Sequence, residues 1–145
     1  MASRSLSLLL IVFVAFACVA ANAQPVVKKT DVTPTSPASG KEMFTTYCAV
    51  CHGNAGKGDG PAAPAMKKNP ANLSELSARN SGKFPEMHVY NTIKGDVAGI
   101  SAHGSRDMPI WGNLFSSLSR GNAGEVQMRV ANLTKYVESL QVAAR

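Results

Sequence analysis

Residues 48–52 read Cys48-Ala49-Val50-Cys51-His52, and they carry the most specific chemical pattern in the chain. Residues three apart lie on the same face of a helix, with about 5–6 Å between their Cβ atoms. On a helix, the thiols of Cys48 and Cys51 would therefore project side by side, and the imidazole of His52 follows directly after them. Thiols and imidazoles both attach or ligate metal centres in proteins. The stretch therefore predicts a bound group at this place.

The spacing Cys-x-x-Cys-His is the pattern through which c-type haem is attached to protein. The two thiols can reach the vinyl groups on neighbouring rings of a haem and form thioether bonds, and the imidazole can then lie beneath the iron as an axial ligand. We therefore predict one haem c with its iron, covalently bound through Cys48 and Cys51, and His52 as the first iron ligand.

Three other interpretations of the cysteine pair fit the chain less well. A zinc site would need two further ligands, and the histidines outside the motif, His88 and His103, are 15 residues apart. A thioredoxin-like redox pair would follow a strand in a βαβ unit, and no such unit is predicted. A disulfide between residues three apart would close a very small loop and leave His52 unexplained, so no disulfide is expected.

The first 23 residues have the layout of a secretory signal peptide. Arg4 is their only charge, residues 6–21 are almost entirely apolar, and Ala21-Asn22-Ala23 forms a small-x-small site. We predict cleavage after residue 23 and a periplasmic protein with no membrane span. A retained membrane anchor is the alternative, although the apolar run is short against the roughly 20 residues that cross a bilayer. Cys18 would leave with this segment, because its surroundings match a lipid-attachment site poorly.

The composition of the remainder suggests a small core. The 145 residues carry a formal charge of +6, which falls to +5 when Arg4 is removed. Their 45% apolar content is unevenly spread, and the chain after the apolar block at residues 6–21 holds few large apolar side chains. A chain with so modest a core usually needs a disulfide, a metal or a cofactor to be stable. Residues 24–38 contain three prolines among Ser and Thr, and they are predicted to form a flexible N-terminal segment. Residues 39–145 remain as the folded domain.

The folded domain begins with a predicted helix that runs toward Cys51. Ser39 and Glu42 fit a capping box at its start. A second helix is bracketed by Pro85 at its first position and Gly95 at its end. Both helices have one apolar face, which consists of Met43, Phe44 and Tyr47 in the first and of Met87, Tyr90 and Ile93 in the second.

Further helices complete a predicted all-α class with long loops. Short helices are expected over residues 73–78 and 114–118, and a long C-terminal helix follows a cap at Asn122. No stretch alternates in the manner of a strand. The apolar face of the last helix repeats at four and three residues: Val126, Val130, Leu133, Val137 and Leu140.

In their order along the chain, these features resemble the class I c-type cytochromes, in particular the small bacterial members with one haem. The segment 40–44 lies where that family has a Gly and a Phe that pack against the C-terminal helix, at a place matched by Leu133 and Tyr136. Asp107-Met108-Pro109-Ile110-Trp111-Gly112 is similar to the segment that carries the distal methionine. The resemblance covers residues 39–141 and implies the cytochrome c fold, with the N- and C-terminal helices packed together around one covalently attached haem.

The same resemblance implies that Met108 is the second axial ligand of the iron, beside a loop that Pro109 stiffens. The rivals are His103 in the preceding Gly- and Ser-rich loop, Met66 in the loop after the cysteine motif, and His88. A bis-His haem would have a lower potential than a His/Met haem. Methionines on predicted helices are expected to pack instead, as most methionines do: Met43, Met87 and Met128.

Further contacts to the cofactor also follow from the resemblance. Pro61, with Pro64 as the alternative, would offer its carbonyl to the ring N–H of His52 and so fix the orientation of the imidazole. Trp111 would hydrogen-bond a haem propionate or fill the core. The pocket would also be lined by Leu73 and Ile93.

A haem with both axial positions filled by protein has no open position for a substrate. We therefore predict an exported carrier of single electrons between respiratory or other redox partners, or the electron-transfer subunit of a redox complex, rather than an enzyme. The alternative is a haem-based enzyme, or a ligand-binding or sensor protein, with a displaceable distal ligand. Two interpretations of Lys57, Lys67 and Lys68 remain open: they steer docking on acidic partner proteins, or they form an ordinary solvated surface. Nothing in the sequence predicts nucleic-acid binding.

Overall fold

The computed structural model describes residues 32–96 and 108–142. Residues 33–145 form one compact unit, which contains almost all of the described residues. The predicted signal segment lies outside them. Within the described ranges every regular element is helical, which confirms the all-α class. No helix in this part of the chain is long and apolar enough to cross a membrane.

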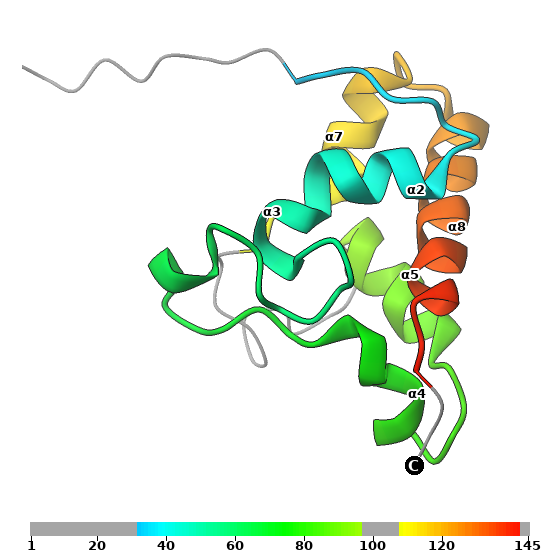
Figure 1. The fold of residues 1–145 in the computed structure, drawn as a ribbon. Helices are drawn as coiled ribbons and strands as arrows, with labels where there is room; N and C mark the ends of the chain where they lie inside the picture. The colour runs from blue at the N-terminus through cyan, green and yellow to red at the C-terminus, as the bar shows by residue number, and fades with distance from the viewer. Residues whose placement is uncertain (1–31, 97–107, 143–145) are drawn as a thin grey trace, which may run out of the picture. The chain divides into compact units, whose positions relative to one another are not determined.

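The helices follow the predicted order. A continuous N-terminal run consists of α2 (Gly40–Met43), a π-helical turn (Phe44–Cys48) and α3 (Ala49–His52). After a 3₁₀ turn at Ala63–Ala65, the chain forms a second such turn at Leu73–Glu75 and then α4 (Leu76–Arg79), α5 (Glu86–Lys94), α7 (Trp111–Leu118) and α8 (Ala123–Ser139) (Figure 1). Helix α7 begins three residues before its predicted start.

The caps of the first and last helices are confirmed. The hydroxyl of Ser39 accepts a hydrogen bond from the backbone N–H of Glu42 at 3.2 Å, and the side chain of Asn122 accepts one from the N–H of Glu125 at 3.1 Å. In a full capping box, the carboxylate of Glu42 would also accept a hydrogen bond from the backbone N–H of Ser39. Here it accepts instead from the N–H of Ser36, at 3.2 Å. Each cap satisfies a donor that the helix itself leaves free.

Helices α2 and α8 cross in close contact, as the resemblance implied (Figure 1). A Cβ atom on Gly40 would lie 2.1 Å from the carbonyl oxygen of Asn132, so only glycine allows the two backbones to approach this closely. One turn further on, the ring centroids of Phe44 and Tyr136 are 5.2 Å apart. Leu133 is fully buried in the same core. These contacts fix the N-terminal run of helix against the C-terminal helix.

The expectation that Met87 and Met128 pack is wrong, whereas Met43 is fully buried. Met87 is 65% exposed and Met128 is 43% exposed. Each precedes a buried valine, Val89 or Val130, by two residues, which places it about 200° around its helix from that valine. Their helices therefore turn these methionines away from the core.

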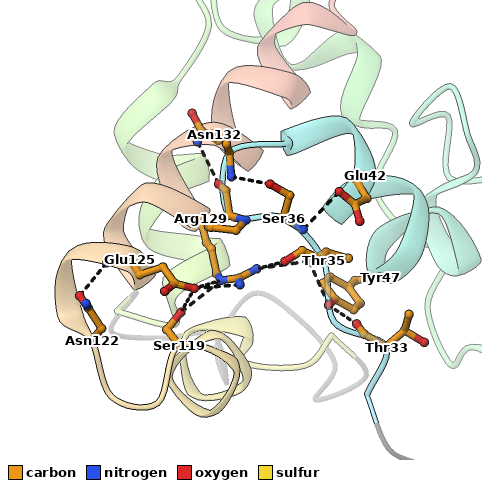
Figure 2. Close-up of polar contacts among 12 residues, drawn as sticks. Thr33, Thr35, Ser36, Glu42, Tyr47, Ser119, Asn122, Glu125, Arg129 and Asn132 are labelled. Carbon is orange, nitrogen blue, oxygen red and sulfur yellow. Dashed lines mark hydrogen bonds and ion pairs between the residues drawn. The ribbon is translucent and has the colours of Figure 1, made fainter.

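The expectation of flexibility up to residue 38 is wrong for residues 33–37, which we call the N-terminal clasp. Thr35 is buried, and its carbonyl accepts a hydrogen bond from Nη1 of Arg129 at 2.9 Å (Figure 2). The carbonyl of Pro37 accepts another from the side-chain amide of Asn132 at 3.0 Å. A composition typical of linkers does not reveal that α8 supplies donors to this backbone. The folded domain therefore begins at residue 33 rather than at residue 39.

Candidate functional site

A mainly apolar cavity of about 330 Å³ lies beside the end of the N-terminal run of helix. Its walls come from α3, the loop that follows, α5, the start of α7 and the inner face of α8. Pro61 is exposed and does not line this cavity. The other predicted site residues all line it: Cys48, Cys51, His52, Leu73, Ile93, Met108 and Trp111.

The thiols of Cys48 and Cys51 are half-buried in the cavity wall and are not joined to each other. Burial raises the pKa of Cys48 to about 12, and the nearby Cys51 adds to this shift. Reactive redox cysteines need a lowered pKa, because the thiolate is the nucleophile. The environment of Cys48 therefore opposes a thioredoxin-like role and leaves a neutral thiol facing the cavity.

The ring of His52 is held by a hydrogen bond between its Nδ1 and the carbonyl oxygen of Ala71, at 3.0 Å. A carbonyl can only accept, so Nδ1 carries the proton and Nε2 keeps a free lone pair. Burial lowers the pKa of His52, while the bond to Ala71 acts in the opposite direction. The neutral ring is the form that ligates a metal.

The predicted role of Pro61 is therefore wrong, and Pro64 does not take it either. The loop after α3 folds back on the helix, with hydrogen bonds from the N–H of Gly60 to the carbonyl of Cys51 at 3.1 Å and from the N–H of Ala62 to the carbonyl of Val50 at 2.9 Å. Pro61 lies between these two donors and is exposed. The ring of His52 is bonded instead to the carbonyl of Ala71, ten residues after Pro61.

The predicted distal ligand and two of its rivals line the cavity together with His52: Met108, Met66 and His88. Met66 follows the 3₁₀ turn at Ala63–Ala65, and His88 lies on α5 with an exposed side chain. The other predicted rival, His103, falls outside the described residues. The cavity thus brings the predicted distal methionine to the same space as the cysteine motif.

Tyr47 lines the cavity as well, although the sequence indicated only a packed helix face. It lies in the π-helical turn, directly before Cys48. Its ring stacks on Trp111 with centroids 5.7 Å apart, and both rings contact Phe115. Its position next to the first cysteine was the available signal for a role in the site.

Two unpaired thiols, an imidazole with one free nitrogen and an apolar cavity fit a covalently attached haem. They define a class of proteins that hold haem through two thioether bonds and a histidine ligand. The family model Cytochrome c matches residues 37–141, and the chain belongs to the cytochrome c family. Membership implies a covalently bound haem with iron and, in general terms, a haem-based electron carrier. Comparison with curated proteins and with solved structures gave no match.

Proposed function

We propose that this protein is an exported carrier of single electrons whose haem iron is ligated by His52 and Met108. The observation that carries the proposal is the ring of His52. Ala71 engages its Nδ1 while Nε2 remains available for a metal, in the cavity that Met108 also lines. When bound, the haem supplies reversible exchange of one electron at its iron.

The chain's own residues contribute attachment, orientation and exclusion of water. Cys48 and Cys51 hold the group through thioether bonds, and the carbonyl of Ala71 orients His52 and raises its basicity. Leu73 and Ile93 present apolar side chains to the same cavity. A fixed, dry surrounding of this kind keeps structural change small when an electron arrives or leaves.

Met108 is the proposed second ligand because Pro109 restricts the backbone directly beside it. Met66 and His88 line the cavity too and are the residues against which this choice is tested. If His52 and Met108 both ligated the iron, these two side chains would leave no position for a substrate. This supports an electron carrier, acting alone or as the electron-transfer subunit of a redox complex, rather than an enzyme.

Spectroscopy and redox titration of the holoprotein test this assignment. Wild type should have a low-spin six-coordinate haem that takes up CO only slowly, and Met108→Ala should lower the potential and admit CO rapidly. Met66→Ala and His88→Ala are the matched controls and should leave both properties unchanged. Rapid CO uptake by wild type would favour a ligand-binding or enzymatic haem protein instead, and a wild-type spectrum in Met108→Ala would exclude this methionine.

The proposed location is the periplasm, and the proposed partners are acidic redox proteins. Lys57, Lys67 and Lys68 are exposed, and Lys68 also lines the cavity. Positive charge near the cofactor would accelerate encounter with an acidic donor or acceptor. Changing the three lysines to Glu should slow electron transfer at low salt and have little effect at high salt, where charges are screened. Lys135→Glu on α8 is the control for altered charge.

A further inference from the structure

A directed chain of hydrogen bonds runs from α8 to Tyr47 through the N-terminal clasp (Figure 2). Nη1 of Arg129 lies 3.3 Å from the hydroxyl of Thr35, that hydroxyl lies 3.1 Å from the phenol oxygen of Tyr47, and the phenol donates to the carbonyl of Thr33 at 2.5 Å. A guanidinium only donates and a carbonyl only accepts. The hydroxyl of Thr35 must therefore donate to the phenol oxygen of Tyr47, and the hydroxyl of Tyr47 donates to the carbonyl of Thr33. All hydrogen bonds in this series thus run in one direction.

Arg129, where this series of hydrogen bonds starts, is held in place because it is 4% exposed and donates several other hydrogen bonds. Its Nε donates to the hydroxyl of Ser119 at 3.1 Å, its Nη2 donates to the carboxylate of Glu125 at 2.9 Å, and its Nη1 donates to the carbonyl of Thr35 at 2.9 Å. A buried guanidinium with these partners has little freedom to move. Hydrogen bonds that follow one another in a chain also polarise each other.

The other side of Tyr47 faces the haem cavity. Its ring is 7% exposed, lines the cavity and stacks on Trp111 at an interplanar angle of 28°. Trp111 lines the cavity as well. The hydroxyl of Tyr47 is therefore bonded to the clasp, while its ring lies in the part of the cavity wall that also contains Trp111. Met108, the proposed distal ligand, lies three residues before Trp111.

We propose that Tyr47 is a positioning residue, whose anchoring by the clasp and Arg129 holds Trp111 in the cavity wall and thereby limits displacement of Met108 from the iron. The part that concerns Met108 rests on the proposed His/Met function, whereas the part that concerns Trp111 does not. Without its hydroxyl, the ring of Tyr47 keeps its volume but loses its hydrogen bonds to Thr33 and Thr35 in the clasp. The wall that includes Trp111 then opens more often.

The test compares Tyr47→Phe with Tyr136→Phe in the holoprotein. Both changes remove one phenol oxygen, but Tyr136 packs on Phe44 and does not line the cavity. Trp111 is the only tryptophan, and its emission is quenched when it lies close to haem. Tyr47→Phe should increase the long-lived fraction of Trp111 emission, and the rate of CO uptake by the ferrous form, by about threefold to tenfold each. This range corresponds to about 0.7–1.4 kcal/mol, which is the lower end of what the loss of the two hydrogen bonds of the Tyr47 hydroxyl supports.

Tyr136→Phe should leave the emission and the CO rate at their wild-type values. The proposal is overturned if Tyr47→Phe lowers thermal stability while both of these stay unchanged, because the phenol then has a structural role alone. If Tyr47→Phe gives no holoprotein, Thr35→Val removes the middle link of the chain, and the same readouts decide. Rapid CO uptake by wild type would overturn the His/Met ligation, and the Trp111 emission of the variants would still decide whether Tyr47 positions the wall.

Discussion

The N-terminal clasp and the cysteine-motif wall, by which we mean the cavity-lining stretch 48–71, are assembled in opposite ways. The wall comes from one stretch of chain, in which the loop after α3 is bonded back to the helix through Gly60 and Ala62 and reaches His52 at Ala71. The clasp is held largely by Arg129 and Asn132 on α8, which donate to the carbonyls of Thr35 and Pro37, 94 and 95 positions earlier. The cysteine-motif wall is local in sequence, whereas the clasp depends mainly on contacts between residues far apart in the chain.

The chemistry of this site and its structural support are therefore encoded in different parts of the sequence. The cysteine motif brings two thiols and an imidazole together through the geometry of a single helix. The clasp contributes no group that could touch a cofactor, yet it holds Tyr47, which faces the same cavity. Changes in the cysteine-motif wall should therefore abolish attachment of the cofactor, whereas changes in the clasp should destabilise the fold around the cofactor.

Removal of the thiols is the largest change that this comparison predicts. In the double variant Cys48→Ser, Cys51→Ser, covalently bound haem should be lost completely, because no other described cysteine faces the cavity. Haem staining after denaturing electrophoresis measures this. Cys18→Ser, in the predicted signal segment, is the matched control and should retain the stain. Covalent haem in the double variant would contradict the proposed attachment.

Removal of the guanidinium from the clasp should destabilise the protein without removing haem. Arg129→Ala leaves the buried hydroxyl of Ser119 and the carbonyl of Thr35 without their donor, which should lower the free energy of unfolding by about 3 kcal/mol. Denaturant titration of the holoprotein measures the loss. Lys135→Ala, exposed on the same helix, should change it little. A loss no greater than that of Lys135→Ala would mean that the clasp contributes nothing to stability.

A smaller loss is expected where the N-terminal run of helix meets α8. In Gly40→Ala the new Cβ would lie 2.1 Å from the carbonyl of Asn132, so the two helices must move apart, at a cost of about 2 kcal/mol. Gly82→Ala is a control in which a Cβ meets no atom within 4 Å, although its φ of +79° adds some backbone strain. If Gly40→Ala is as stable as wild type, the close contact between α2 and α8 does not stabilise the position of the N-terminal run of helix.

The sequence predicted the local parts of the molecule well and the long-range parts poorly. Spacing and caps indicated the helices, and the resemblance placed Gly40 against the C-terminal helix and Met108 near the cavity. The identity of Ala71 as the partner of His52 was out of reach, because every residue of a loop has a carbonyl and no side chain distinguishes one from another. Arg129 gave no signal either, since a charged residue on a helix is ordinarily exposed.

The smallest expected effect is a dependence of stability on pH that originates beside the clasp. Hydrogen bonds from Ser119 and then from Arg129 hold the pKa of Glu125 below its usual value of 4.5. Because the folded state favours the ionised carboxylate, this contribution to stability is present above pH 4.5 and is lost as the pH falls through the lowered pKa. The unfolding free energies of wild type and Glu125→Gln should therefore converge in acid. Ser119→Ala, which removes the largest cause, should reduce the same pH dependence. A constant difference between wild type and Glu125→Gln from neutral to acid pH would show that this carboxylate does not couple the clasp to pH.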